Sequence, residues 1–206
     1  DALGLTEDER ATLAAAARGG RDAETAPTSA GTPLAVNELP GEPTPLIGRE
    51  REAEVVRRLL AQPGTRLLTL TGPGGVGKTR LALHVARSVV DQYSDGVVWV
   101  ELANVTDPGL VLPSIAQAVG LPAALGGDAR EALLGRLRGK RVLLVLDNVE
   151  HVRDAGPDLG RLLLADSGLQ IMATSQAPLS IRGEQEYVVP PLELPPADHV
   201  HEYRRI

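Results

Sequence analysis

The stretch of sequence that decides the fold is Gly72-Pro73-Gly74-Gly75-Val76-Gly77-Lys78-Thr79. It matches the pattern G-x-x-x-x-G-K-[ST] at every fixed position. The apolar run 67–71 before it is typical of a strand, and residues 80–86 after it have the pattern of a helix. A glycine-rich turn that fitted the pattern by chance would not need a strand and a helix on its two sides. We therefore interpret the stretch as a phosphate-binding loop.

The residue types of this loop suit an anionic ligand. Glycines 72, 74, 75 and 77 allow backbone conformations that turn successive N–H groups inward, and the following helix directs its positive end to the same place. Lys78 adds a compact cation for phosphate, and the hydroxyl of Thr79 is a ligand for Mg²⁺. The loop predicts binding of a nucleoside triphosphate with Mg²⁺.

Composition excludes several classes of protein. The 206 residues carry a net charge of −6 and no cysteine, so disulfides and thiolate metal sites are excluded. The charge also argues against a nucleic-acid surface, and we expect DNA contacts only through domains outside this chain. No apolar run approaches the ~20 residues of a membrane span, so we predict no membrane contact and a cytoplasmic location. The start, Asp1-Ala2-Leu3-Gly4, is typical neither of a signal peptide nor of a natural initiation site, and we expect a fragment.

Four segments are expected along the chain. Residues 1–19 contain a capping-box pattern and predict an N-terminal helix, and residues 20–45, rich in Ala, Thr, Pro and Gly, predict a linker. Residues 46–194 predict the nucleotide-binding domain, and residues 195–206 a short tail.

Strand and helix patterns alternate within the predicted domain. The strands are expected at 67–71, 97–102, 141–146, 169–174 and 186–189, and the helices at 49–61, 80–86, 108–119, 128–137 and 157–165. In the first helix, Val55, Val56, Leu59 and Leu60 are expected on one face. The pattern predicts an α/β fold of the P-loop NTPase type, an open five-stranded parallel sheet with helices on both faces. In such sheets ligands bind at the carboxyl ends of the strands.

Asp147 ends the apolar run 143–146, the arrangement called Walker B. A buried strand would bring this carboxylate beside Thr79, where it can hold the hydration shell of Mg²⁺.

The base for hydrolysis is left open by the sequence. Asn148 follows where many related ATPases carry a second acid, and Glu150 is the nearest other carboxylate, with His151 beside it. Glu150 is therefore either the catalytic base or a solvated residue, and slow turnover is expected.

The end of the next strand carries further polar candidates. Ser175 and Gln176 follow the run 169–174, where they could hydrogen-bond a phosphate or the attacking water. Neither of them is charged. Arg182, a few residues later, is a candidate cation for the γ-phosphate, with an ordinary solvated arginine as the alternative.

With these motifs assembled, the chain resembles the NB-ARC (STAND-class) signalling ATPases of bacterial transcriptional regulators. The resemblance runs from about Pro45 to Pro195 and rests on five segments, which are residues 46–50, 71–82, 144–151, 173–179 and 182–185. Residues 3–10 are also similar to the last helix of a Cro/repressor-like helix-turn-helix domain.

The resemblance implies roles for individual residues. Ile47, Gly48 and Arg49 would border the adenine, Lys78 and Thr79 would bind phosphate and Mg²⁺, and Asp147 would be the Walker B acid. The candidate catalytic residues are Lys78, Asp147, Glu150 and Gln176. The other predicted nucleotide contacts are Gly72, Pro73, Gly74, Gly75, Val76, Gly77, Arg80, Ser175, Arg182 and Pro191. The family usually has Arg at position 176, as the sensor of the γ-phosphate, whereas this chain has Gln176. The resemblance also implies self-association in the ATP state.

These observations favour an ATP- or ADP-dependent switch that regulates transcription through flanking domains, with weak or partner-dependent ATPase activity. A P-loop small-molecule or nucleotide kinase is an alternative, although no compact Arg-rich lid is evident between the strands. A GTPase is disfavoured because the N-K-x-D signature is missing. A nucleotide-binding module that does not hydrolyse is the remaining alternative, which Asn148 and Gln176 favour.

Overall fold

The structure is a computed structural model that describes residues 39–42, 44–122 and 129–192. The predicted N-terminal helix, most of the predicted linker and the predicted tail lie outside the described residues. None of the helices within the described ranges is both long enough and apolar enough to cross a bilayer.

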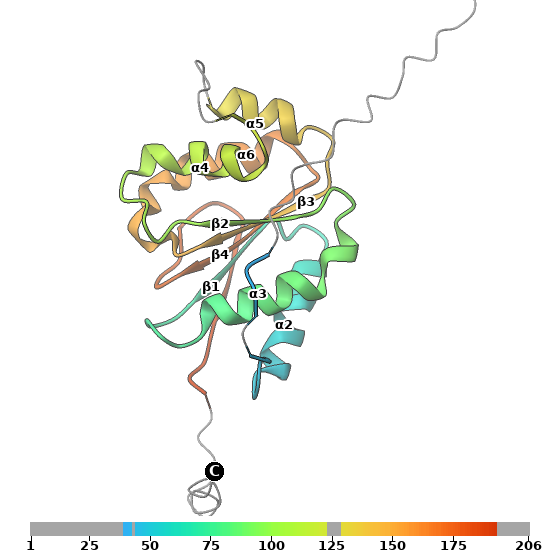
Figure 1. Cartoon of the computed structure of the whole chain (residues 1–206), viewed down its shortest axis with the longest axis vertical. Helices are drawn as coiled ribbons and strands as arrows, with labels where there is room; N and C mark the ends of the chain where they lie inside the picture. Colours follow the sequence, from blue (N-terminus) through green and yellow to red (C-terminus); the bar gives the residue numbers. More distant parts are fainter. Residues whose placement is uncertain (1–38, 43, 123–128, 193–206) are drawn as a thin grey trace, which may run out of the picture. The chain divides into compact units, whose positions relative to one another are not determined.

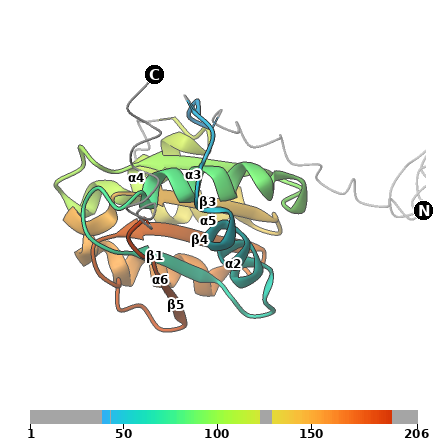
Figure 2. The same ribbon diagram turned by 90° about the horizontal axis from the view of Figure 1, so that it is seen from below.

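A five-stranded parallel sheet forms the centre of the described chain, in the order β2-β3-β4-β1-β5. The strands are β1 (Leu67–Thr71), β2 (Val97–Glu101), β3 (Val142–Asp147), β4 (Leu169–Ser175) and β5 (Glu184–Val188). Figure 1 shows the sheet between two layers of helices, and Figure 2 shows β5 beside β1 at one edge. This is the α/β P-loop NTPase architecture predicted from the sequence.

The helices are α2 (Glu50–Ala61), α3 (Lys78–Ser88), α4 (Val111–Ala118), α5 (Ala129–Leu137) and α6 (Gly156–Ala165). Short 3₁₀ turns lie at Val90–Gln92, Pro108–Leu110, Val149–His151 and Arg153–Ala155. Between β4 and β5 the described chain has a loop, residues 176–183, and no helix.

Alternation along each strand divides the core into two parts. In β3, Val142, Leu144 and Leu146 face the side covered by α4, α5 and α6, and Leu143 and Val145 face α2 and α3. Successive side chains of a strand point to opposite faces, so a continuously apolar strand must be covered on both. The Leu- and Val-rich strands therefore require the two helical layers seen in Figure 1.

Helix α2 differs in one respect from its predicted face. Ala53, Val56 and Leu60 are buried, as expected of an i, i+3, i+7 stripe, while Val55 is 40% exposed. Val55 lies outside the buried stripe because it is about 100° around the helix from Val56. Leu59 is only partly buried.

Candidate functional site

The phosphate loop occupies residues 72–77, between the carboxyl end of β1 and the first turn of α3. Gly72, Gly75 and Gly77 have φ values of 146°, 78° and 97°, a region that residues with side chains rarely adopt. Gly74 is not among the residues with positive φ, so the prediction that all four glycines are required by backbone conformation is wrong at this position.

Several amides of this loop are free to bind an anion. In the described part of the chain, the N–H groups of Gly74, Gly75 and Gly77 have no protein acceptor, and the N–H of Val76 donates to the carbonyl of Pro73 at 3.4 Å. Helix α3 begins at Lys78, so its unpaired first-turn amides and its positive dipole end are at the same place. The loop therefore offers the cluster of donors that a phosphate group requires.

Lys78 lies at this loop with its side chain folded over the backbone. Its Nζ donates to the carbonyl oxygens of Gly72 at 2.9 Å and Pro73 at 3.1 Å, and the residue is buried. The ammonium group is thus held beside the amides of residues 74–77, where it adds a full positive charge.

Thr79, in the first turn of α3, meets Asp147 although β1, which leads into the loop before α3, and β3 are not neighbours in the sheet. Asp147 ends β3, which is separated from β1 by β4, and its Oδ1 accepts a hydrogen bond of 2.8 Å from Thr79 Oγ1. An ionised carboxylate only accepts, so the hydroxyl hydrogen points at Asp147 and the hydroxyl lone pairs remain for a cation. Mg²⁺ prefers oxygen ligands and keeps several waters, so Thr79, Asp147 and the phosphates of a nucleotide are a donor set that fits it.

Thr174 is part of this site and was not predicted. Its Oγ1 donates to Asp147 Oδ1 at 2.6 Å and accepts from the backbone N–H of Asn148 at 2.9 Å. The signal in the sequence is a hydroxyl residue directly after the apolar run 171–173, one position before Ser175. Ser175 itself is buried, and its Oγ accepts from the N–H of Ala177 at 3.3 Å.

The structure brings Glu150 and Gln176 together beyond the ends of β3 and β4. Gln176 Nε2 lies 3.4 Å from Glu150 Oε1, and Glu150 Oε2 is buried without a hydrogen-bond partner in the described chain. Asn148, which precedes them, has a φ of 63°, a left-handed conformation that Asn tolerates better than most residues. His151 is exposed. The candidate base and the residue at the sensor position therefore face each other across adjacent strand ends.

Three segments meet at Arg49. The residue is only 3% exposed, and its guanidinium donates to the carbonyls of Val76 at 2.8 Å and Pro190 at 2.7 Å. The guanidinium therefore ties the phosphate loop to the chain that follows β5 and approaches Pro191. Any contact of this region with a base would come from the backbone of Gly48 or from Ile47, which is 78% exposed.

The two other predicted arginines lie apart from the loop amides. The guanidinium of Arg80 donates to the carbonyls of Thr44 at 3.0 Å and Pro45 at 3.1 Å. Arg182 lies before β5, whose first residue pairs with the first residue of β1, so it is at the amino edge of the sheet. The prediction that Arg182 senses a γ-phosphate is wrong, because the phosphate loop is at the opposite, carboxyl edge.

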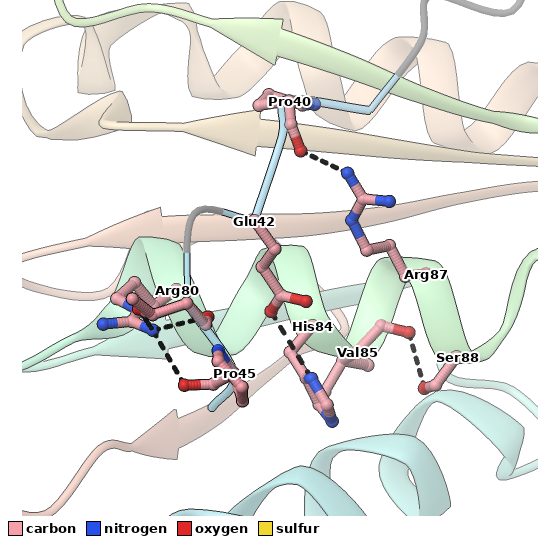
Figure 3. Close-up of polar contacts among 9 residues, drawn as sticks. Pro40, Glu42, Pro45, Arg80, His84, Val85, Arg87 and Ser88 are labelled. Carbon is pink, nitrogen blue, oxygen red and sulfur yellow. Dashed lines mark hydrogen bonds and ion pairs between the residues drawn. The ribbon is translucent and has the colours of Figure 1, made fainter. Parts of the chain in front are cut away.

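A segment before α2, residues 39–42 and 44–46, lies along α3, and we call it the strap. Figure 3 shows three α3 side chains on one helical face reaching toward it, Arg80, His84 and Arg87. His84 Nδ1 lies 3.4 Å from Glu42 Oε1, and Arg87 donates to the carbonyl of Leu39 at 3.1 Å and to that of Pro40.

Leu39 and Leu46, at the two ends of the strap, pack against the core between α2, α3 and the sheet. The last part of the predicted linker is therefore bound to the domain.

Together, the fold and the site define a P-loop ATPase domain. Comparison with known protein families matches residues 61–185 to the family described as AAA domain. That match covers more than half of the chain, and the chain belongs to this family.

The chain is also similar to proteins of known sequence and to a solved structure. An uncharacterized protein of Mycobacterium tuberculosis is 41% identical over 152 residues, covering 73% of this chain and 38% of the relative. A second protein of that organism, provisionally named an HTH-type transcriptional regulator, is 43% identical over 140 residues, covering 68% of this chain and 15% of the relative. The Drosophila ORC structure bound to DNA has a similar fold, with a TM-score of 0.50 and 17% identity over 68% of this chain and 42% of that chain. The chain thus spans only a minor part of these relatives.

Proposed function

We propose that this chain binds ATP or ADP with Mg²⁺ and acts as the nucleotide-dependent switch of a regulatory ATPase of the NB-ARC type. The observation that carries the binding part is the hydrogen bond between Thr79 and Asp147, 2.8 Å long, beside a loop in which the amides of Gly74, Gly75 and Gly77 have no acceptor in the described chain. This bond joins two motifs that lie 68 residues apart in the sequence.

Each side chain has a distinct task in this proposal. The loop amides and Lys78 bind the phosphates, and Thr79 and Asp147 hold Mg²⁺, which neutralises phosphate charge when it is bound. Arg49 fixes the carbonyl of Val76 and thereby the shape of the loop. The backbone around Ile47 and Gly48, with Pro191, forms the border for the base.

The switch part is supported by the position of the strap. The strap leads directly into residues 47–49 at the proposed base site, and Arg80, one residue after Thr79, holds its end. A nucleotide bound between these residues would therefore favour a docked strap, and the chain upstream of residue 39 would respond. The provisional name of one relative supports an output in transcription, with DNA bound by domains outside this chain. Self-association in the ATP state is part of the same proposal.

Hydrolysis is proposed to be slow or dependent on a partner. Glu150, the candidate base, has its Oε1 beside Gln176, which brings no positive charge to the γ-phosphate. A binding module without hydrolysis is the second candidate, and the uncharged side chain at position 176 is the observation that favours it.

Thermal unfolding with and without Mg·ATP tests nucleotide binding. Ligand that binds only the folded state stabilises it by about 2.7 kcal/mol at 100 times Kd, so the melting temperature should rise. Lys78→Ala should abolish the rise, because the phosphates lose their cation. Lys140→Ala is the matched control, since Lys140 pairs with Asp95 at 3.3 Å at the other edge of the sheet, and the rise should persist.

Two outcomes would contradict the proposal. An unchanged melting temperature of the parent chain at millimolar Mg·ATP would exclude the binding part. Transfer of phosphate from ATP to a small-molecule acceptor would instead indicate a kinase.

A further inference from the structure

A buried hydroxyl outside the two recognised motifs contacts the carboxylate of Asp147. Thr174, in β4, is fully buried, and its Oγ1 lies 2.6 Å from Asp147 Oδ1. Strand β4 lies between β3 and β1 in the sheet, so Thr174 stands between the strand that carries the carboxylate and the strand that leads into the loop.

The directions of the hydrogen bonds around Thr174 are determined by chemistry. Asp147 as a carboxylate accepts only, so Thr174 must donate its single hydroxyl hydrogen to it. The Thr174 oxygen then accepts the N–H of Asn148 at 2.9 Å. Thr79 donates to the same Oδ1 at 2.8 Å. One carboxylate oxygen is thus fixed by two hydroxyl groups from two different elements.

The second carboxylate oxygen is left free by this arrangement. In the described chain both hydrogen bonds to the Asp147 side chain end on Oδ1, and Oδ2 accepts none from a protein group. Fixing Oδ1 restricts the rotamer of Asp147 and so determines the direction in which Oδ2 would be available to Mg²⁺. The bond to Asn148 additionally holds the left-handed residue, φ 63°, that turns the chain away directly after Asp147.

We propose that Thr174 is a positioning residue for Mg²⁺ binding, which acts by orienting the carboxylate of Asp147 through its hydroxyl group. This inference rests on the proposed function, because it concerns the Mg²⁺ of the proposed nucleotide site. In this proposal β4, which leads to Gln176, also orients the carboxylate of Asp147 at the end of β3, through Thr174.

The chain offers a matched control for the test. Thr69, in β1, is also fully buried, but its hydroxyl has no hydrogen-bond partner in the described chain. Thr174→Val and Thr69→Val remove the same atoms and add the same methyl group at two buried strand positions. Only the first removes hydrogen bonds.

The experiment measures the Kd of ADP by calorimetry with Mg²⁺ and with EDTA, for the parent chain, Thr174→Val, Thr174→Ser and Thr69→Val. Thr174→Val should raise the Kd of Mg·ADP about tenfold, equivalent to about 1.4 kcal/mol, and change the Kd in EDTA less than about twofold. Thr174→Ser should restore the parent affinity, and Thr69→Val should leave it unchanged. Equal Mg²⁺ dependence in Thr174→Val and the parent, or an equal loss with Mg²⁺ and with EDTA, would overturn the inference.

A second measurement needs no nucleotide and separates this inference from the proposed function. Amide exchange by NMR should be faster at Asn148 in Thr174→Val, because its acceptor is lost, and unchanged in Thr69→Val and Thr174→Ser. Unchanged exchange at Asn148 overturns the inference while leaving nucleotide binding intact. Failure of the parent chain to bind ADP at all overturns the proposed function, and the Mg²⁺ role of Thr174 with it.

Discussion

Glycine serves two different purposes in the phosphate loop. At Gly75 and Gly77 an added Cβ would meet nothing within 4 Å, so only the positive φ requires glycine. At Gly72 both reasons apply, because a Cβ would lie 3.2 Å from the carbonyl oxygen of Val189 and from a methyl group of Val76. Gly74 has neither constraint.

Gly72→Ala and Gly74→Ala should therefore differ in stability. Gly72→Ala should lower the free energy of unfolding by about 1–3 kcal/mol, since alanine is strained at φ 146° and crowds the backbone that follows β5. Gly74→Ala should change it by less than about 0.5 kcal/mol. Urea unfolding of the two variants measures this difference, and equal destabilisation would contradict it.

The charge at position 176 should control phosphate release. Gln176→Arg places a cation at the end of β4, beside Glu150, and should raise the rate of phosphate release from Mg·ATP at least about tenfold. Gln92→Arg, which adds the same charge on an exposed turn before β2, is the control. A rate that stays unchanged in Gln176→Arg would mean that a missing base or partner limits hydrolysis.

At the scale of elements, helix α3 contributes both to the phosphate site and to the contacts with the strap. Its first turn carries Lys78 and Thr79, and the face with Arg80, His84 and Arg87 holds the strap (Figure 3). These positions follow the i, i+4, i+7 spacing of one helical face. One helix therefore connects the phosphate site to the strap.

Nucleotide binding should slow hydrogen exchange in the strap, and loss of contacts to the strap should weaken nucleotide binding. Hydrogen exchange of residues 39–46 should slow when Mg·ADP binds, and His84→Ala combined with Arg87→Ala should reduce that protection. Linkage then requires a weaker nucleotide affinity, by about two- to fivefold, because exposed charged contacts contribute about 1 kcal/mol or less. Arg80 is left in place, since it follows Thr79 directly.

Arg57→Ala combined with Arg58→Ala is the control for the strap. These exposed arginines pair with Glu54 within α2 and do not touch the strap. Exchange of residues 39–46 that is the same with and without Mg·ADP in the parent chain would rule out the coupling.

At the scale of the whole described domain, the sheet order determines which predicted residues share a site. Because β4 and β1 lie between β3 and β5, the ends of β3 and β4 and the phosphate loop meet at the carboxyl edge. The chain then returns through residues 176–183 to the amino edge before β5 begins. Arg182, only six residues from Gln176 in sequence, is thereby carried to the opposite side of the sheet.

The local features of the protein could be predicted from the sequence. The strand, loop and helix around Lys78, the apolar strand ending in Asp147 and the fold class follow from contiguous patterns of apolar residues and glycines. Backbone conformation and burial periodicity depend on neighbours a few residues away, which is why such patterns suffice.

Only the tertiary structure decided which distant groups touch. Thr174 and Asp147 are 27 residues apart, Arg49 and Pro190 are 141 apart, and neither contact has a sequence pattern of its own. Residues 39–45 of the strap were predicted as the end of a linker because their composition lacks periodicity, yet the strap packs against the core through its own Leu39 and Leu46 and contacts one face of α3. Such contacts depend on strand order and on the three-dimensional path of the chain, and a hydrogen bond carries no signal along the sequence between its two ends.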